Sequence, residues 1–262
     1  MKYLDVVAAG IKETIAYRTE FFAGLLGAFI NLGVLWFAWN AVFAASKLEV
    51  IGGFSLSTMI TYLVISSCLR PLTYSDIEYE MEEDVRSGAI STILTKPVSY
   101  PLFRISKGFS NTIFHLITNV LPIFMVSILL IKISMPVDVL FFLISVFLGY
   151  IVNYLLAFLT GMWAFWSIGS IWGIKLSKQM ISDVMSGAII PIYLFPVWFQ
   201  GIAQLLPFQA VFNIPISIYI GKITGIGIFY SLIQQFAWIF ILAFLSYLAW
   251  KFAERRVVVH GG

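Results

Sequence analysis

Six apolar runs, each long enough to cross a membrane as a helix, dominate this sequence of 262 residues. At 1.5 Å per residue, about 20 apolar residues span the roughly 30 Å hydrocarbon core of a bilayer. The composition agrees, since 60% of the residues are hydrophobic and only 11% are charged. The sequence therefore predicts an all-α polytopic protein of the lipid bilayer with six transmembrane helices. They cover residues 21–45, 51–69, 108–131, 139–168, 181–199 and 226–252.

Nothing in the sequence divides these runs into separate domains. No linker rich in proline, glycine or serine interrupts them, so we expect a single transmembrane domain over 1–262. The only cysteine, Cys68, lies inside an apolar run, which excludes an intrachain disulfide and a metal site built on several cysteines. With two histidines in the chain we expect no bound metal, and we expect no nucleic-acid partner.

The lysines and arginines predict an orientation. Thirteen of the 16 basic residues fall on one side of the predicted spans, and the other side holds only Lys47, Lys132 and Lys222. Loops rich in lysine and arginine stay on the cytoplasmic side. We therefore expect a multi-pass protein of the cell membrane with both termini in the cytoplasm.

The residues before the first run have helical spacing. Leu4, Ile11 and Ile15 recur on one face, and most charged side chains lie elsewhere. This pattern predicts an amphipathic helix over 1–20 in the cytoplasmic interface of the membrane. The alternative is a helical leader surrounded by water.

The predicted cytoplasmic loop at 70–107 contains a concentration of charge. Six of the nine residues at 78–86 are charged, whereas Ile77, Met81 and Val85 form one apolar seam at i, i+4 and i+8. The sequence therefore predicts a short cytoplasmic helix with an acidic flank and an apolar ridge.

This helix has signals at both ends. Ser75 is placed to cap it, with Glu78 three residues later, and Gly88 is placed to end it. A second apolar piece follows and stops before Pro97. Because long loops in compact proteins are commonly functional, we interpret residues 75–95 as a docking segment for a cytoplasmic partner. The alternative is a solvated helix that only keeps the loop soluble.

The segment after the fifth run is rich in proline. Pro191, Pro196 and Pro207 cannot donate backbone hydrogen bonds, so one continuous helix is not expected here. Irregular backbone at membrane depth occurs only where protein or a water-filled cavity covers it. We predict short re-entrant helices on the outer side over 191–224, with Trp198 at the interface. The alternative is a proline-kinked fifth helix with a surface loop. Three glutamines are expected to face water or a partner subunit: Gln200, Gln204 and Gln209.

Polar side chains also occur within the predicted spans. Asn111, His115 and Asn119 form a stripe at i, i+4 and i+8 of the third run, and Asn31 and Asn40 lie in the first. They are candidates for lining a translocation path. Hydrogen bonding between helices is the alternative and the commoner role of such residues.

The sequence contains none of the catalytic motifs that we considered. There is no G-x-x-x-x-G-K-[ST] phosphate loop. Ser110 and His115 are five residues apart, which points them away from each other on a helix, so an intramembrane protease is the weaker alternative. An ion-coupled secondary transporter is the other alternative. It has little support, because Asp183 is expected near the cytoplasmic start of the fifth span and no other carboxylate falls clearly within a span.

Three strings together resemble the permease subunits of type-2 ATP-binding-cassette exporters over essentially the whole length. They are "YRTEFF" before the first run, "EEDVRSGAISTILTKPVSYPLFRISKG" in the charged loop, and "PIYLFPVWFQGIAQLLPFQAVFNIP" after the fifth. The terminal "HGG" resembles a six-span branch related to proposed drug and viologen exporters, although the valines before it depart from the Tyr-containing ending of that branch.

The resemblance implies a non-catalytic membrane subunit that exports a hydrophobic or amphipathic substrate, as in multidrug efflux. Two permease subunits, identical or different, would form a dimer. Separate ATPase subunits would carry ATP and Mg²⁺, and this chain would hold no cofactor. The family's pathway is lined by spans one, two and five, which favours Asn31 and Asn40. In the coupling helix, Ile77, Met81 and Val85 would be knobs that enter a groove of the ATPase. The rim contacts would come from Glu78, Glu82, Glu83, Asp84 and Arg86, next to Gly88.

Overall fold

The computed structural model describes residues 18–260, except positions 74, 96, 98, 132 and 168. The interfacial helix predicted over 1–20 lies outside the described residues, apart from its last three, which begin helix α2. The described chain is almost entirely helical. A short antiparallel hairpin, β1 (Val50–Ile51) with β2 (Phe54–Ser55), follows α2.

Three helices within the described residues are long and apolar enough to cross a membrane. They are α2 (Arg18–Ser46), α8 (Val139–Gly161) with the 3-10 turn η3 (Met162–Phe165), and α12 (Ile226–His260). A bent pair, 197–205 with 207–219, gives a fourth if it is counted as one span, with an angle of 75° between its halves. The first, fourth and sixth apolar runs are thus confirmed as long helices.

Two further runs form helices that differ from their predicted bounds. The second run begins in the hairpin, and its helix α3 extends over Leu56–Thr73. The third lies inside a longer helical stretch made of α6 (Tyr100–His115), η1 (Leu116–Val120), α7 (Leu121–Val126) and η2 (Ser127–Ile131). The π-helical turn η1 ends two residues before Pro122, where the missing N–H and the ring disturb regular hydrogen bonding.

The prediction of a fifth helix over 181–199 is wrong. Helix α9 covers Ile171–Met185, so Asp183 lies in its last turn, and a buried turn at 186–188 follows. Gly187 in this turn has a φ of 78°, and Pro191 comes shortly after it. A left-handed glycine and a proline both stop a helix. Hydropathy alone registered the apolar residues and missed this break.

The chain beyond the break folds into four short helical pieces: η4 (Ile192–Leu194), α10 (Val197–Leu205), η5 (Pro207–Ala210) and α11 (Asn213–Tyr219). Pro191 and Pro196 stand immediately before η4 and α10, and Pro207 begins η5. At these positions a missing backbone N–H costs nothing. The broken, proline-started backbone predicted for this segment is therefore confirmed.

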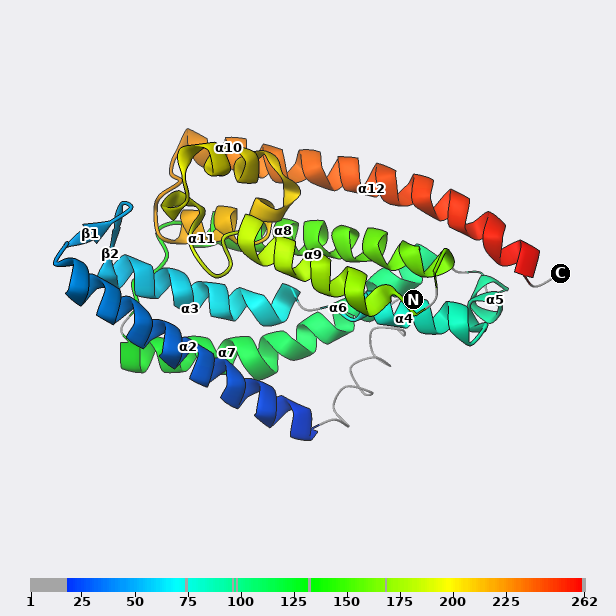
Figure 1. Cartoon of the computed structure of the whole chain (residues 1–262), viewed down its shortest axis with the longest axis horizontal. Coiled ribbons are helices and arrows are strands. Elements are labelled where there is room, and N and C mark those ends of the chain that lie inside the picture. The colour runs from blue at the N-terminus through cyan, green and yellow to red at the C-terminus, as the bar shows by residue number, and fades with distance from the viewer. Residues whose placement is uncertain are drawn as a thin grey trace.

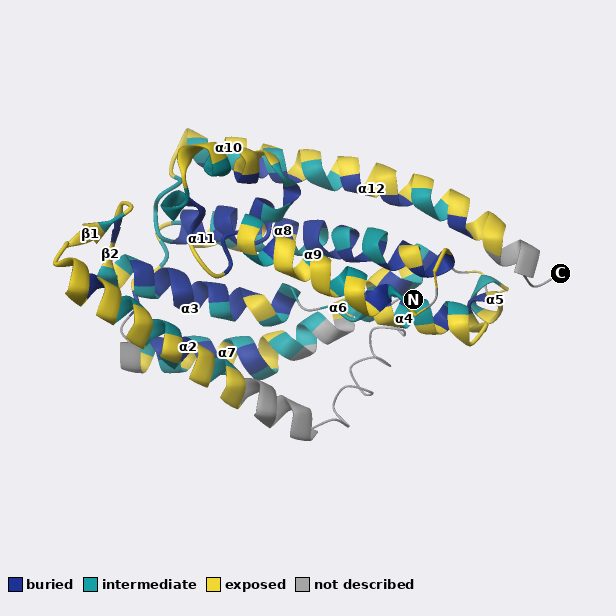
Figure 2. Ribbon diagram, in the orientation of Figure 1, coloured by how far each residue is buried: buried dark blue, intermediate teal, exposed yellow. Residues whose placement is uncertain are grey.

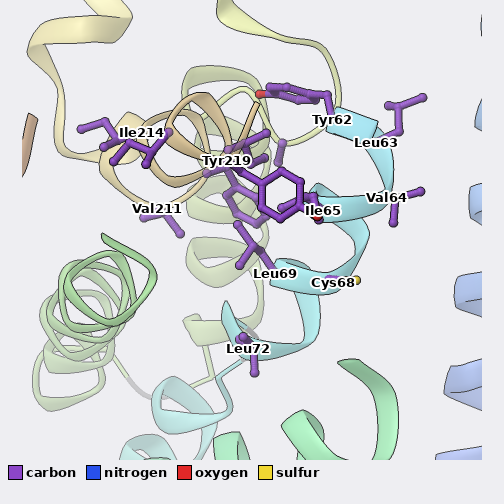
Figure 3. Close-up of a cluster of buried hydrophobic side chains, with 14 of the residues drawn as sticks. Tyr62, Leu63, Val64, Ile65, Cys68, Leu69, Leu72, Val211, Ile214 and Tyr219 are labelled. Atoms are coloured by element: carbon purple, nitrogen blue, oxygen red, sulfur yellow. The ribbon is translucent and has the colours of Figure 1, made fainter. Parts of the chain in front are cut away.

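Helix α3 lies at the centre of the molecule, with α2 along one edge and α12 along the opposite edge (Figure 1). In Figure 2 α3 is largely buried, whereas α12 carries an exposed stripe along its length. Apolar side chains of α3 pack against the η5–α11 segment, as Figure 3 shows for Ile65, Leu69 and Tyr219. We call the end with the hairpin, α10 and α11 the α10 end, and the opposite end, with α4 and α5, the α4 end.

Candidate functional site: the anchored helix α4

The charged stretch forms helix α4 (Ile77–Arg86), followed by α5 (Ala89–Leu94). The backbone N–H of Ile77 donates to Ser75 Oγ, at 3.3 Å, at the start of α4. Gly88 separates the two helices with a φ of 74°, a conformation that glycine adopts without strain. The short helix, its glycine stop and the second short helix before Pro97 are therefore confirmed.

The apolar seam of α4 faces inward. Met81 is 0% exposed and Ile77 is 3% exposed, and both pack in a cluster with Phe158 and Met162. At Gly161 of α8 a Cβ atom would stand 2.7 Å from Met81 Sδ, so the glycine permits this close approach. The prediction that Ile77 and Met81 are knobs for a partner is therefore wrong. The i, i+4, i+8 spacing showed that an apolar face exists and could not show that the chain itself covers it.

Arg104 of α6 holds one flank of α4. Its Nη1 lies 2.6 Å from Glu80 Oε2, and its Nη2 donates to Asp84 Oδ2 and to the Glu80 carbonyl oxygen. The phenol of Tyr100 donates a 2.8 Å hydrogen bond to Asp84 Oδ2, and Lys107 Nζ lies 3.0 Å from Glu80 Oε1. Burial lowers the pKa of Arg104, but Tyr100, Glu80 and Asp84 raise it by more. The guanidinium is therefore fixed in its charged form.

Helix α9 holds the other flank. Lys175 Nζ lies 2.9 Å from Asp76 Oδ1 and 4.2 Å from the centre of the Tyr79 ring. Lys178 Nζ pairs with Glu78, whose side chain is 0% exposed. Glu78 is therefore turned toward α9, and the capping role suggested for it is replaced by an ion pair.

The turn before α9 adds one more contact, since the Gly169 N–H donates to Glu82 Oε1 at 2.6 Å. Glu78, Glu82 and Asp84 thus bind elements of their own chain. This use corrects the prediction that Glu78 and Asp84, both buried, form the rim of a partner site. Much of the charge in this stretch anchors α4 to α6 and α9.

The remaining surface of α4 and α5 is exposed. Arg86 pairs with Glu83 three residues earlier, and both side chains are mostly exposed. Val85 is half-buried, and Gly88 is exposed with no atom within 4 Å of the place where its Cβ would be. Figure 1 shows α5 beyond α4, on the side away from the α10 end. The exposed positions on this corner are Tyr79, Glu83, Arg86, Ser87, Gly88, Ala89, Ser91 and Thr92.

The polar residues of the predicted path lie in two places. Asn119 is buried, and its Nδ2 lies 3.2 Å from His115 Nδ1, so these two members of the stripe hydrogen-bond with each other. The side chain of Asn111 is not among those described. On α2, Asn40 Nδ2 donates to the Trp36 carbonyl oxygen at 2.8 Å, and Asn31 is exposed.

The three predicted glutamines at the α10 end differ in their exposure and hydrogen-bond partners. Gln209 is buried, and its Nε2 donates to the carbonyl oxygen of Gln204, while Gln200 Nε2 donates to the Phe195 carbonyl oxygen at 2.8 Å. Gln200 and Gln209 therefore satisfy backbone groups left over where the helices break. For the buried Gln209 this corrects the prediction that it faces water or a partner. Gln204 itself is exposed, as is Trp198 on α10.

Three anchoring residues, Arg104, Lys175 and Lys178, were not among the predicted site residues. In the sequence they served only to indicate sidedness. One available signal was the charge balance: residues 76–84 carry an excess of acidic side chains, and the flanking segments carry a similar excess of basic ones. That match does not reveal which charges meet, because the pairs are up to 100 residues apart.

A sequence model described as "ABC-2 family transporter protein" matches residues 29–261. The chain belongs to this family. A comparison of this ABC-2 transporter protein with curated proteins found no match. Membership makes it a membrane component of a transporter and implies association with ATP-binding-cassette ATPases. The match covers α4 and its three anchoring residues.

Proposed function

We propose that this ABC-2 transporter protein is the permease subunit of an exporter. It moves a hydrophobic or amphipathic substrate across or out of the cell membrane. A separate ATPase subunit, which binds ATP and Mg²⁺, provides the energy. The observation that supports this most is the rigid mounting of α4 by ion pairs on both flanks, with one corner left exposed. A helix fixed in this way can receive a push from a partner without being displaced alone.

The contact for the ATPase is the α4–α5 corner. The apolar seam of α4 is occupied by the permease itself, so the partner meets small and polar side chains such as Ala89 and Thr92 together with Glu83 and Arg86. The small exposed side chains from Ser87 to Thr92 suit close insertion into a groove. Tyr79, Glu83 and Arg86 are the larger exposed side chains of the corner.

Six spans and cytoplasmic termini complete the proposal. The second span is α3, the third is the part of the α6–η2 stretch that follows Lys107, and the fifth is α9 with the chain up to η4. The proposed cytoplasmic side is the α4 end. Most of the described basic residues lie there, as at Lys175, Lys251 and Arg256, while Lys47 and Lys222 lie near the α10 end. This asymmetry is what the positive-inside rule requires. The short helices of the α10 end form the outer re-entrant segment.

A second permease subunit covers the exposed face of α9. Trp172, Leu176, Met180 and Val184 recur there at intervals of four and are all exposed. Ser177 and Gln179 are also exposed. Polar side chains within a span are usually turned toward protein or water, so this face suits a partner subunit better than lipid.

The test is purification of the permease with its ATPase and measurement of ATP turnover in vesicles. Ala89→Arg with Thr92→Arg should abolish co-purification, because two long charged side chains would obstruct the corner. Glu49→Arg, at the exposed opposite end, is the matched control and should change nothing. Undiminished co-purification by the corner variant would contradict the docking site. Transport that persists without ATP and collapses with an uncoupler would contradict the exporter and support an ion-coupled carrier.

A further inference from the structure

Helix α9 is bound to α3 at the end away from α4. Asp183 in its last turn lies 3.2 Å from Arg70 Nη1. In the turn that follows, Tyr62 Oη donates to the Gly187 carbonyl oxygen at 2.6 Å, and Ser66 Oγ donates to the Ala188 carbonyl oxygen at 2.5 Å. The turn at 186–188 is buried. It is therefore held to the central helix of the molecule.

Between its two attachments α9 is a continuous rod. Its 15 residues span about 22 Å at 1.5 Å per residue. Beyond the turn at 186–188 the chain enters η4 and then α10. The rod is therefore tied to α4 by ion pairs at one end and continues covalently into the short helices of the α10 end at the other.

The joint between α4 and α9 resists separation. Glu78 is fully buried, and its Oε2 accepts no hydrogen bond from any described atom. Among the described residues, the Lys178 ammonium is the group that balances the charge of this carboxylate. Withdrawing it would leave a buried charge unpaired, which is strongly unfavourable. Lys175 adds an ion pair to Asp76 and a cation–π contact to Tyr79 one turn earlier. Two adjacent turns of α9 are consequently tied to the first turns of α4.

We propose that Lys175 and Lys178 are positioning residues that make α9 follow α4. A displacement of α4 by the ATPase is carried along α9 to the turn at 186–188 and from there to α10. The inference rests on the proposed function and assigns the transmission step to one helix and two side chains. Rigid elements joined by packed polar contacts are the physical means by which distant sites are coupled.

The test measures movement at the α10 end without knowledge of the substrate. Spin labels are placed on Val50→Cys in the hairpin and Val197→Cys on α10, both exposed, with the buried Cys68 replaced by serine. The distance between the labels is recorded in vesicles, with the ATPase bound, with and without ATP and Mg²⁺. ATP turnover is measured on the same samples.

Lys175→Met with Lys178→Met should keep ATP turnover within about twofold and reduce the nucleotide-dependent population shift at least about fivefold, which is the lower range of measured couplings between sites. Lys175→Arg with Lys178→Arg preserves the charges and should restore the shift. Lys251→Met, which removes an exposed lysine of α12, is the matched control and should behave as wild type. If the double methionine variant does not fold, the single Lys175→Met takes its place, since Asp76 is partly exposed and tolerates the loss better.

A full nucleotide-dependent shift in the methionine variant overturns the proposal and leaves the proposed function standing. If the methionine variant loses both ATPase binding and the shift, the proposal is also overturned, because the lysines would then only hold α4 in place. A wild-type complex that shows neither ATP turnover nor a shift contradicts the proposed function itself, and the transmission step with it.

Discussion

Arg104 Nη1 lies 2.6 Å from Glu80 Oε2, and this ion pair joins α4, inside the charged loop, to α6, which leads out of the loop. The guanidinium is only 4% exposed and also bonds Asp84 and the carbonyl oxygen of Glu80. One side chain thus satisfies two carboxylates and a backbone group of α4. Such a buried charge is the kind of group whose removal is costly, because its carboxylate partners are largely buried.

Arg104→Met should lower the free energy of unfolding by about 3–5 kcal/mol, since it leaves Glu80 and Asp84 without their main partner. Thermal unfolding in detergent micelles measures this. Arg86→Met is the control: its pair with Glu83 is mostly exposed, and pairs of that kind contribute about 0–1 kcal/mol. Equal effects of the two substitutions would show that the Arg104 cluster is no anchor.

Met81→Ala should cost about 2–5 kcal/mol, because it creates a cavity at a fully buried position. Thr92→Ala on the exposed side of α5 should stay within about 0.5 kcal/mol. The same unfolding measurement compares them. A neutral Met81→Ala would mean that the seam is free for a partner after all. Release of the ATPase by Met81→Asp, in contrast, would reflect loss of the α4 structure and would say nothing about direct contact.

Gly187→Ala should destabilise the protein by about 1–3 kcal/mol, the range for a non-glycine residue held at positive φ. The residue has a φ of 78°, and an added Cβ would stand 2.8 Å from Tyr62 Oη, the donor of the hydrogen bond to its carbonyl oxygen. Gly201→Ala in α10 meets nothing within 4 Å and should stabilise by about 0.4–1 kcal/mol. If both substitutions change the free energy of unfolding in the same direction, the turn is not strained in the way that the geometry indicates.

The sequence was sufficient for features that depend on local composition. Uninterrupted hydropathy located α2, α8 and α12, and the position of Gly88 located the break between α4 and α5. Proline spacing gave the short helices at the α10 end. Each of these follows from the residues of a single segment, through the cost of unpaired backbone groups in lipid or the allowed angles of glycine and proline.

Features that depend on contacts between distant segments could not be predicted from the sequence in the same way. The apolar seam that contains Met81 has the same sequence pattern whether a partner protein or α8 covers it. The partners of Glu78 and Asp76 lie on α9, about 100 residues away. The helix predicted over 181–199 failed for a related reason, because the break at Gly187 is held by hydrogen bonds from Tyr62 and Ser66 of α3. Tertiary contacts decided these cases.

Lys222 links three loops at the α10 end. Its Nζ lies 3.5 Å from the centre of the Phe54 ring on β2 and 4.5 Å from that of Tyr193 on η4, while its own N–H donates to the Ser217 carbonyl oxygen at 2.8 Å. The hairpin, η4 and the turn before α12 therefore share one ammonium group. A lysine between two aromatic faces is held by attraction to their π systems.

Lys222→Met should lower the free energy of unfolding by about 0.5–2 kcal/mol, because methionine fills a similar volume without the charge that binds both rings. Lys47→Met removes an exposed lysine near the same end and should have no measurable effect. Limited proteolysis adds a local readout, since loosening of the three loops should speed cleavage near the hairpin before the whole molecule unfolds. A Lys222→Met protein that matches wild type in both measurements would show that Phe54 and Tyr193 hold these loops through their own packing, and that the ammonium group contributes nothing to closing the α10 end.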